Sequence, residues 1–245
     1  MRCTAMCVAI LVLAACAASA GVIDEMKILN RNGAVVSFCA VVTAVFSDCC
    51  YVQDFDGGAG IKVRNLPRAT QDVGFILSGV IRTDGQRERV IWWNGATACG
   101  PIIGGDPQVP LYLPNLFIGG PNLFYDARTG RGQKGAYGSI GFNNVGLLVT
   151  TSGFVSTVNT RYRYFYVDDG GGRWDGSGYP GVRVSYADID WTGPDAPVVV
   201  GDLVDVAGIS TLYPISGRAG SLIRTRHLDD IVVQQPARRG RRGRR

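Results

Sequence analysis

The sequence has few of the residues that most enzymes use for acid–base and nucleophilic chemistry. It contains a single histidine, His227, and neither a G-x-S-x-G nor an H-E-x-x-H motif occurs. A lone histidine without a recognisable partner is usually structural, because catalysis needs several groups arranged together. Carboxylates are plentiful but fall in predicted turns. We therefore expect no enzymatic activity, no cofactor and no bound metal.

Charge and helical periodicity are also scarce. Charged residues make up 18% of the chain, and no long stretch has a helical pattern of apolar residues. The 34 glycines, with frequent valines and aromatic residues, instead indicate short strands joined by glycine-rich turns. After the first twenty residues no segment is long and apolar enough to span a bilayer as a helix. The remaining ~225 residues suit one large β domain or two small ones.

The first twenty residues are typical of an export signal. Arg2 precedes the apolar run AMCVAILVLAACAASA, which is too short for a membrane span. The small residues at 18–20 predict cleavage after Ala20. Residues 13–16 (LAAC) also resemble a bacterial lipoprotein box, in which Cys16 would carry a lipid anchor. Both alternatives place the protein outside the cytoplasm, secreted or at the cell envelope.

The net charge of +5 is concentrated at the C-terminus. Without Arg2 and six C-terminal arginines, 18 basic residues face 20 acidic ones, so the remaining body is near −2. Glycines between the arginines prevent a stable helix, and we expect a disordered tail that contacts phosphates without reading bases. The tail arginines are Arg238, Arg239, Arg241, Arg242, Arg244 and Arg245.

Four cysteines follow the signal segment: Cys39, Cys49, Cys50 and Cys99. An even number in an exported chain favours disulfides. If Ser47-Asp48 is a hairpin tip, Cys39 lies on the order of 20 Å along the first strand from Cys49, beyond the ~7 Å disulfide limit. A Cys39–Cys99 pair stays open, but we favour small buried thiols.

One stretch of the sequence occurs twice. YVQDFDGGAGIKV (51–63) has a longer counterpart in YVDDGGGRWDGSGYPGVRV (166–184), and each copy predicts two strands joined by an Asp/Gly turn. The preceding runs VVSFCAVVTAV (35–45) and LVTTSGFVSTV (148–158) also match. Each copy is followed by an apolar run that ends in Gly79 or Gly208, then by a turn and a last strand.

Five strands per copy predict an all-β fold of two OB-like, five-stranded Greek-key barrels in tandem. A two-layer sandwich is the alternative. The apolar Gly/Pro-rich stretch between the copies predicts an ordered connector, packed so that both barrels form one rigid body. The predicted divisions are a signal peptide (1–20), a first barrel (21–99), a connector (100–144), a second barrel (145–235) and a disordered tail (236–245).

The second copy and the residues before it resemble a known group. The succession FYVDDGGGRWDGSGYPGVRV and VGDLVDVAGIS, preceded by GGPNLFYDARTGRGQKGAYGSIGFNNVGLLV, is similar to secreted bacterial tandem OB-fold proteins of unknown function. The similarity covers nearly all of Val22–Val233, but the arginine run is not part of the shared pattern. The resemblance implies the fold, without an enzymatic activity or an agreed ligand.

Alternation along the strands divides each copy into two faces. Four side chains of each copy are predicted to point into the core: Cys50, Val52, Ile61, Val63 and Phe165, Val167, Val182, Val184. The opposite face is predicted to carry Tyr51, Lys62 and Arg64 in the first copy and Tyr164, Tyr166 and Arg183 in the second.

This outward face is the main candidate ligand site. In OB folds it binds extended ligands, with aromatic rings stacking on bases or sugars and basic groups meeting phosphates or acidic sugars. Trp174, Tyr179 and the hairpin tip 161–163 would extend it. The alternative is that the face packs against the connector or the other barrel.

Two further motifs have ordinary structural explanations. Gly130–Gly135 matches G-x-G-x-x-G, but dinucleotide binding needs a following helix, and AYGSIGFNN predicts none. Asp168, Asp169 and Asp175 could ligate calcium, yet their spacing is not that of an EF-hand, and a hairpin turn explains them better.

The sequence therefore favours an exported, non-catalytic binding or interaction module. We expect nucleic acid or another polyanion to bind through the OB faces and the arginine tail, with the near-neutral body making nucleic-acid affinity weak and tail-dominated. Carbohydrate binding and a purely structural role in the cell envelope are the alternatives. The expected partners are nucleic acid, an acidic polysaccharide or an envelope protein.

Overall fold

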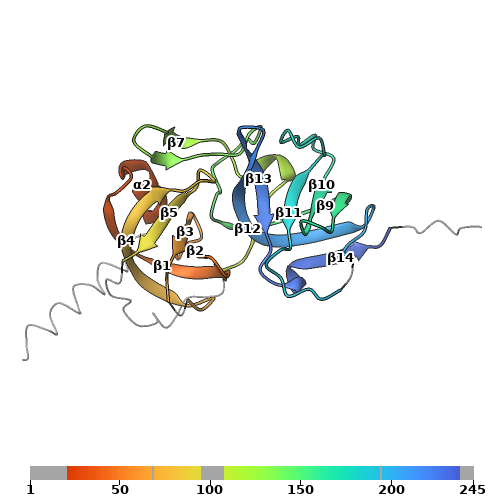
Figure 1. The fold of residues 1–245 in the computed structure, drawn as a ribbon, viewed down its shortest axis with the longest axis horizontal. Helices are drawn as coiled ribbons and strands as arrows, with labels where there is room; N and C mark the ends of the chain where they lie inside the picture. The colour runs from red at the N-terminus through yellow and green to blue at the C-terminus, as the bar shows by residue number, and fades with distance from the viewer. Residues whose placement is uncertain (1–20, 68, 95–107, 194, 238–245) are drawn as a thin grey trace, which may run out of the picture. The chain divides into compact units, whose positions relative to one another are not determined.

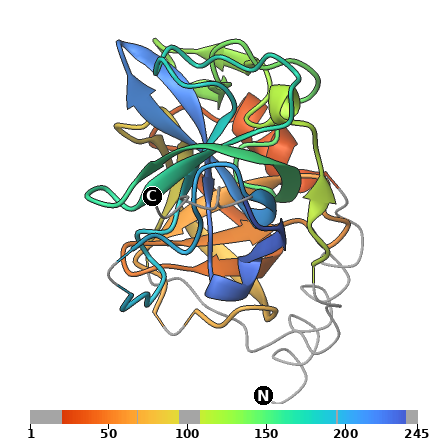
Figure 2. The ribbon, with the colours of Figure 1, turned by 90° about the vertical axis from the view of Figure 1, so that its right-hand side faces the viewer.

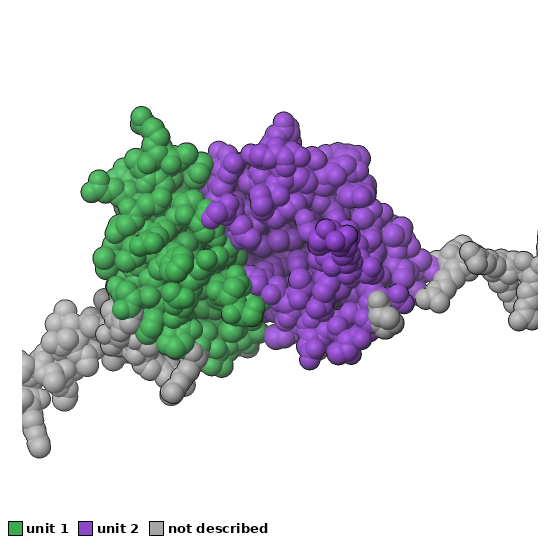
Figure 3. Space-filling model, in the orientation of Figure 1, with its two compact units in different colours: residues 1–84, 89–108, 124–133 green, residues 85–88, 109–123, 134–245 purple. Residues whose placement is uncertain are grey.

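The computed structural model describes residues 21–67, 69–94, 108–193 and 195–237. Three parts of the sequence analysis lie outside these described residues: the predicted signal segment, which includes Cys16; the cysteine Cys99; and the arginine tail. The chain divides into two compact units (Figure 3). Unit 1 comprises residues 1–84, 89–108 and 124–133, and unit 2 comprises residues 85–88, 109–123 and 134–245. The predicted connector, 100–144, is thus divided between the units.

Unit 1 contains a closed five-stranded β-barrel, coloured from red to yellow in Figure 1. The strand order is β1-β2-β3-β5-β4. Neighbouring strands are antiparallel except β3 and β5, which run parallel. The strands are β1 (Val35–Val45), β2 (Cys50–Gln53), β3 (Gly60–Arg64), β4 (Gly74–Thr83) and β5 (Arg89–Trp93). The predicted β fold with a closed barrel is confirmed here.

Unit 2 is built on a seven-stranded sheet of order β14-β12-β13-β11-β10-β9-β6, in which β12 also pairs with β9. As in unit 1, one parallel pair, β11 and β13, lies among antiparallel neighbours, and the short strand β6 also runs parallel to β9. The strands are β6 (Leu111–Tyr112), β9 (Leu148–Asn159), β10 (Tyr164–Asp168), β11 (Val182–Ser185), β12 (Leu203–Ile215), β13 (Arg218–Arg224) and β14 (Ile231–Gln235). A 3₁₀ turn, η1 (Asn115–Phe117), follows β6. A separate two-stranded sheet, which apart from Leu123 belongs to unit 1, contains β7 (Leu123–Asp126) and β8 (Arg131–Gln133).

The two copies of the repeated motif form corresponding strand pairs. Tyr51 of β2 lies opposite Lys62 of β3, and Tyr166 of β10 lies opposite Arg183 of β11. All eight side chains predicted to point inward are buried in the core clusters of their units, so the inward assignment is confirmed. Apolar alternation specifies this register, because a slip by one residue would turn every core side chain outward.

A glycine marks the position where one long strand changes its partner. The first part of β4 pairs with β1 and the second with β5, and Gly79 lies in the overlap. Gly208 has the same position in β12, between the parts that pair with β9 and β13. A Cβ atom would lie 2.4 Å from the Trp92 carbonyl oxygen at Gly79 and 2.6 Å from the Arg224 carbonyl oxygen at Gly208. Only glycine permits so close a backbone approach.

The last predicted strand, residues 221–233, is interrupted in the structure. After β13 the chain forms the 3₁₀ turn η2 (Leu228–Asp230) before β14 begins. The Asp230 carboxylate accepts the backbone N–H of Arg226 at 2.7 Å and pairs with its guanidinium at 2.8 Å. The His227 side chain caps the same turn. These local polar contacts compete with strand pairing and account for the break.

A short helix that the sequence analysis did not predict lies before the barrel. Helix α2 (Val22–Leu29; red in Figure 2) begins after Gly21 and buries Ile23 and Met26, one helical turn apart, in the core of unit 1. A helix of eight residues is too short to show a clear period of apolar residues in the sequence. The signal-like run that precedes it also obscured where the helix begins. Among the described residues, no helix has the length and apolar character needed to cross a membrane.

The cysteines confirm one expectation and correct another. Ser47 and Asp48 form the hairpin tip, with Val45 opposite Cys50, and both Cys49 and Cys50 are free thiols. The predicted absence of a bridge from either to Cys39 is therefore confirmed. Cys39 itself is disulfide-bonded, contrary to the favoured buried thiol. The alternative partner considered from the sequence, Cys99, lies outside the described residues.

The aspartate of the first repeated motif connects the β2–β3 turn to helix α2. Asp54 is buried, and its Oδ2 accepts the backbone N–H of Ile23 at 3.2 Å. Burial raises the pKa of its carboxyl from 3.8 to about 7, with further increases from the charges of Asp56 and Asp24; the hydrogen bond from Ile23 and the charge of Lys27 oppose the rise. The folded protein consequently retains a proton that the unfolded chain loses near pH 4.

Replacing Asp54 with asparagine should change how stability depends on pH. Because the folded-state pKa is raised, stability of the native protein should fall as pH increases from about 4 to 7, by up to roughly 4 kcal/mol, and then level off. Asp54→Asn keeps an acceptor for Ile23 but cannot ionise, so that decline should disappear. Urea unfolding at pH 4.5 and at pH 8 measures the change in the free energy of unfolding. Asp229→Asn, which replaces an exposed carboxylate, is the control. An unchanged decline in Asp54→Asn would contradict this assignment.

Candidate functional site

The predicted outward residues of unit 1 meet one another but present little surface. Tyr51 is 1% exposed and Lys62 2%. Lys62 Nζ lies 5.6 Å from the centre of the Tyr51 ring and pairs with Asp84 at 3.0 Å. Arg64 is half-buried, with its guanidinium 5.6 Å from the Trp92 ring. Tyr51 and Lys62 therefore pack and form an ion pair instead of offering a stacking surface.

The corresponding residues of unit 2 form a compact aromatic and cationic cluster. Tyr166 is 1% exposed, and its hydroxyl lies 2.8 Å from that of Tyr213. The Arg183 guanidinium lies 3.7 Å from the ring centre of Tyr164 and 4.6 Å from that of Tyr213. Tyr164 and Arg183 keep partial exposure, whereas Tyr166 is not accessible to a ligand in this arrangement.

A buried polar network continues from this cluster beneath the β10–β11 loop. Tyr213 donates a hydrogen bond to Asp175 Oδ2 at 2.5 Å, and Asp175 Oδ1 accepts the backbone N–H of Ser177 at 2.9 Å. Burial raises the pKa of the Tyr213 hydroxyl strongly, and its hydrogen bonds to Asp175 and Tyr166 add to the rise. Arg173 is also fully buried and donates to Ser221 Oγ at 3.0 Å. This network fastens the loop to β12 and β13.

The loop carboxylates accept backbone hydrogen bonds. Asp168 accepts the N–H of Gly170 at 3.0 Å, and Asp169 accepts the N–H of Gly171 at 2.8 Å. Asp175 is fully buried. Within the described part of the chain, no three His, Cys, Asp or Glu side chains are placed to share a metal ion. The hairpin-turn interpretation of this loop agrees with these contacts.

Two aromatic residues of the loop keep a large accessible surface. Trp174 is 55% exposed and Tyr179 41%, and the Tyr179 ring lies 5.4 Å from that of Tyr166. Tyr162, at the proposed hairpin tip, is 60% exposed, so these three aromatic side chains are accessible, unlike Tyr166.

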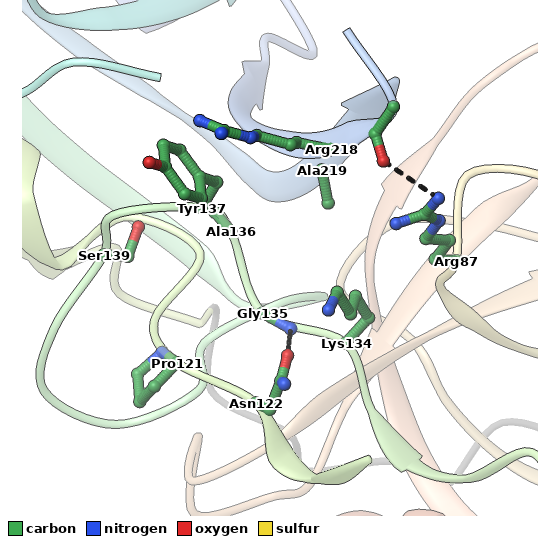
Figure 4. A pocket seen from close by; sticks show the side chains of 11 residues that line it. Arg87, Pro121, Asn122, Lys134, Gly135, Ala136, Tyr137, Ser139, Arg218 and Ala219 are labelled. Atoms are coloured by element: carbon green, nitrogen blue, oxygen red, sulfur yellow. Dashed lines mark hydrogen bonds between the residues drawn. The ribbon is translucent and has the colours of Figure 1, made fainter. Parts of the chain in front are cut away.

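Unit 2 also contains a basic pocket that the sequence analysis did not identify. The pocket has a volume of about 410 Å³, and Figure 4 shows its walls. Three cationic side chains contribute to the lining, and no aspartate or glutamate does. The lining residues are Arg87, Pro121, Asn122, Lys134, Gly135, Ala136, Tyr137, Ser139, Gly217, Arg218 and Ala219. We call this cavity the basic pocket.

The turn between β12 and β13 positions two of the three cations. Ile215 lies opposite Arg218, so Ser216 and Gly217 form a two-residue turn, and both have positive φ, 46° and 75°. Arg87 Nη2 donates to the Gly217 carbonyl at 3.1 Å. The Arg218 guanidinium lies 3.9 Å from the centre of the Tyr137 ring. The Gly217 carbonyl and the Tyr137 ring thus help to fix the positions of these two guanidinium groups.

Buried contacts of the neighbouring residues fix the other walls. Glu88, beside Arg87, is buried and accepts hydrogen bonds from Thr211 Oγ1 and, at 2.7 Å, from the Leu212 N–H. On the opposite wall, the Gly135 N–H donates to Asn122 Oδ1 at 3.0 Å. A Cβ atom at Gly135 would lie 2.2 Å from the Pro121 carbonyl carbon, so glycine is required next to Lys134.

The end of the G-x-G-x-x-G stretch therefore contributes to the lining of the basic pocket. Gly130 and Gly132 have positive φ, and Lys134 and Gly135 line the basic pocket. No helix follows in residues 134–147, as the sequence predicted. The sequence signal for this pocket was weak, since Arg87 and Arg218 belong to no recognised motif and Lys134 lies in a motif that was interpreted as a plain glycine turn.

The thiols and the histidine do not form a catalytic group. Cys49 and Cys50 line a second cavity, of about 300 Å³, in unit 1, but burial raises the pKa of the Cys50 thiol to about 12. A thiol with so high a pKa is a poor nucleophile near neutral pH. His227 caps the turn η2, as described above.

Removing the Tyr213 hydroxyl should destabilise unit 2. Tyr213→Phe removes the hydrogen bond that the buried Asp175 Oδ2 accepts and the one shared with the Tyr166 hydroxyl, so the free energy of unfolding should fall by about 1–3 kcal/mol. Tyr162→Phe removes an exposed hydroxyl and should change it by less than about 0.5 kcal/mol. Urea unfolding compares the two variants. Equal stability of Tyr213→Phe and the native protein would show that the network contributes little.

No protein-family model matches this chain, and no match was found among curated proteins or solved structures. A functional assignment consequently depends on the residues and geometry of the chain itself.

Proposed function

We propose that this chain is an exported, non-catalytic binding module that holds an anionic ligand in the basic pocket. The observation that carries the proposal is the composition of the pocket wall. Arg87, Lys134 and Arg218 line one cavity to which no carboxylate contributes. Guanidinium and ammonium groups form charge-assisted hydrogen bonds with phosphates and carboxylates, and arginine suits both in bidentate geometry.

The accessibility of the pocket favours it over the strand faces proposed from the sequence. Arg87 and Arg218 are exposed and Lys134 is half-buried, whereas Tyr51, Lys62 and Tyr166 are buried. A ligand can reach the pocket cations without a change in packing. Like-signed charges that converge in a concave wall also reinforce one another's potential and attract an oppositely charged ligand.

The absence of recognisable catalytic groups from the wall supports a binding role. The only hydroxyls that line the pocket belong to Ser139 and Tyr137, and Ser139 Oγ donates to the Ile118 carbonyl at 2.6 Å. Neither side chain has a histidine or carboxylate base beside it in the wall. Nucleophilic catalysis requires such a base within hydrogen-bond reach.

The tandem OB arrangement, with the resemblance to secreted bacterial proteins, belongs to the same proposal. The pairing order β9-β10-β11-β13-β12 with the β12–β9 contact parallels the order β1-β2-β3-β5-β4 and supports a second OB-type barrel in unit 2. Export follows from the signal-like residues 1–20, with lipid anchoring at Cys16 as the alternative. A sandwich would lack the β12–β9 pairing.

Carbohydrate binding is the second candidate function, because Trp174 and Tyr179 are the accessible aromatic residues of the β10–β11 loop. Stacking on a neutral sugar would involve little ionic contact. Salt separates the candidates, since binding of a polyanion weakens steeply with ionic strength and stacking on a neutral sugar does not.

Neutralising the pocket should weaken polyanion binding. In the full-length mature protein, Arg87→Gln, Lys134→Gln and Arg218→Gln should each raise the Kd for single-stranded DNA or an acidic polysaccharide by about three- to tenfold at low salt. Arg31→Gln removes an exposed charge in unit 1 and serves as the matched control. Fluorescence anisotropy measures binding, and circular dichroism verifies folding. Equal effects of all four substitutions would reject the pocket as the site.

The arginine tail should add a separate, nonspecific contribution. If its six arginines all meet phosphates of a duplex, the slope of log K against log salt should approach about −5. Deleting residues 238–245 should remove most duplex binding at low salt but preserve the effect of the pocket substitutions on the remaining affinity. Unchanged duplex affinity after truncation would assign all binding to the folded units.

A further inference from the structure

We propose that the basic pocket is specific for a phosphomonoester dianion. This inference depends on the proposed anion-binding function and names the chemical class of its ligand. Three cations share one wall that lacks a carboxylate, so charge complementarity favours a group with more than one negative charge. A phosphomonoester carries about −1.5 to −2 at pH 7, whereas a phosphodiester or a single carboxylate carries only −1.

The placement of the cations suits a compact tetrahedral group. Arg87 and Arg218 are both attached to the β12–β13 turn, one through the Gly217 carbonyl and the other as its next residue. Figure 4 shows Arg218 stacked with Tyr137 on one side of the cavity and Lys134 with Arg87 on another. Cations that approach from different sides can each meet a different oxygen of a phosphate, whereas a planar carboxylate offers only two oxygens.

The size of the pocket indicates that the phosphate belongs to a larger molecule. A volume of about 410 Å³ is within the usual range for small-molecule sites and exceeds the need of one tetrahedral ion. The rest of the wall includes Asn122, Ser139 and the half-exposed Tyr137 ring. An amide and a hydroxyl can hydrogen-bond sugar hydroxyls, and an aromatic ring can lie against a sugar or a base. A phosphorylated sugar or a nucleoside monophosphate matches this combination.

The affinity of the pocket for a phosphomonoester should depend on pH, because the ligand itself titrates. The second pKa of a phosphomonoester is near 6. The titratable groups of the wall are Arg87, Lys134, Arg218 and Tyr137, and neighbouring Glu88 is directed to Thr211 and Leu212. The chain's single histidine, His227, caps the turn η2 and is not among the lining residues. The side chains of the wall therefore lack a histidine that would titrate in this range.

Calorimetry with small ligands tests the inference on the full-length mature protein. Ribose 5-phosphate should bind about tenfold more tightly at pH 7.5 than at pH 5, because only the dianion satisfies the three cations. Dimethyl phosphate and sulfate should show no such change, and unphosphorylated ribose should bind at least about tenfold more weakly. Inorganic phosphate and a 5′-phosphorylated oligonucleotide distinguish free phosphate from a nucleic-acid end as the source of the group.

Variants connect the effect to the pocket. Lys134→Met should weaken ribose 5-phosphate binding by about tenfold and reduce its dependence on pH, and Lys134→Arg should restore both. Arg218→Gln, which removes a second charge from the wall, provides another variant in case Lys134→Met is poorly folded, and it should weaken binding to a similar extent. Arg31→Gln should have no effect.

The outcomes separate this inference from the proposed function. Equal affinity for dimethyl phosphate and ribose 5-phosphate, independent of pH, would overturn the phosphomonoester specificity and leave an anion-binding pocket. If none of the pocket variants weakens polyanion binding, the proposed function itself is overturned. Ribose 5-phosphate affinity that is unaffected by Lys134→Met and Arg218→Gln would place the ligand elsewhere and reject this site.

Discussion

The candidate site depends on a constraint of backbone geometry, which involves none of the side chains that line the site. Strand β12 must leave β9 and pair with β13, and Gly208 makes this change of partner possible because its missing Cβ admits the Arg224 carbonyl oxygen. Beyond that point, β12 and β13 form the hairpin that carries Tyr213 into the buried network and Arg218 to the basic pocket. A larger residue at 208 would therefore disturb the network and the pocket together, although it touches neither.

The sequence was most informative where a single local rule decides the structure. Alternation with a period of two placed four core side chains correctly in each repeated motif, and the Asp/Gly runs were correctly identified as turns. The same rule says which side of a sheet a residue faces, but not what lies over it. Asp84 and Tyr213, both distant in sequence, cover Lys62 and Tyr166, so these outward-facing side chains became buried partners.

The basic pocket was beyond the reach of sequence reasoning for a related reason. Arg87, Lys134 and Arg218 lie in three separate segments, each with glycines nearby, and only tertiary structure brings them to one cavity. Composition also obscured them, since removal of the termini leaves a body with a slight negative charge. An average over the whole chain cannot reveal an uneven distribution of charge over its surface.

Several other cations of this protein have a carboxylate as a neighbour. Lys62 pairs with Asp84, Arg224 with Asp188 and Arg226 with Asp230. Arg173, which is fully buried, has its pKa lowered by desolvation, and the charge of Asp175 opposes that shift. Each of these groups is accompanied by a carboxylate within the fold.

The wall of the basic pocket departs from this pattern. Its two arginines contact a carbonyl oxygen and an aromatic ring, and no aspartate or glutamate is among the lining residues. Gathering three like charges in one cavity costs Coulomb energy, which is tolerable at an accessible surface because water screens it. A bound anion would remove that repulsion as well as form its own contacts. The local electrostatics thus favour occupation by an anion, even though the folded body as a whole is not basic.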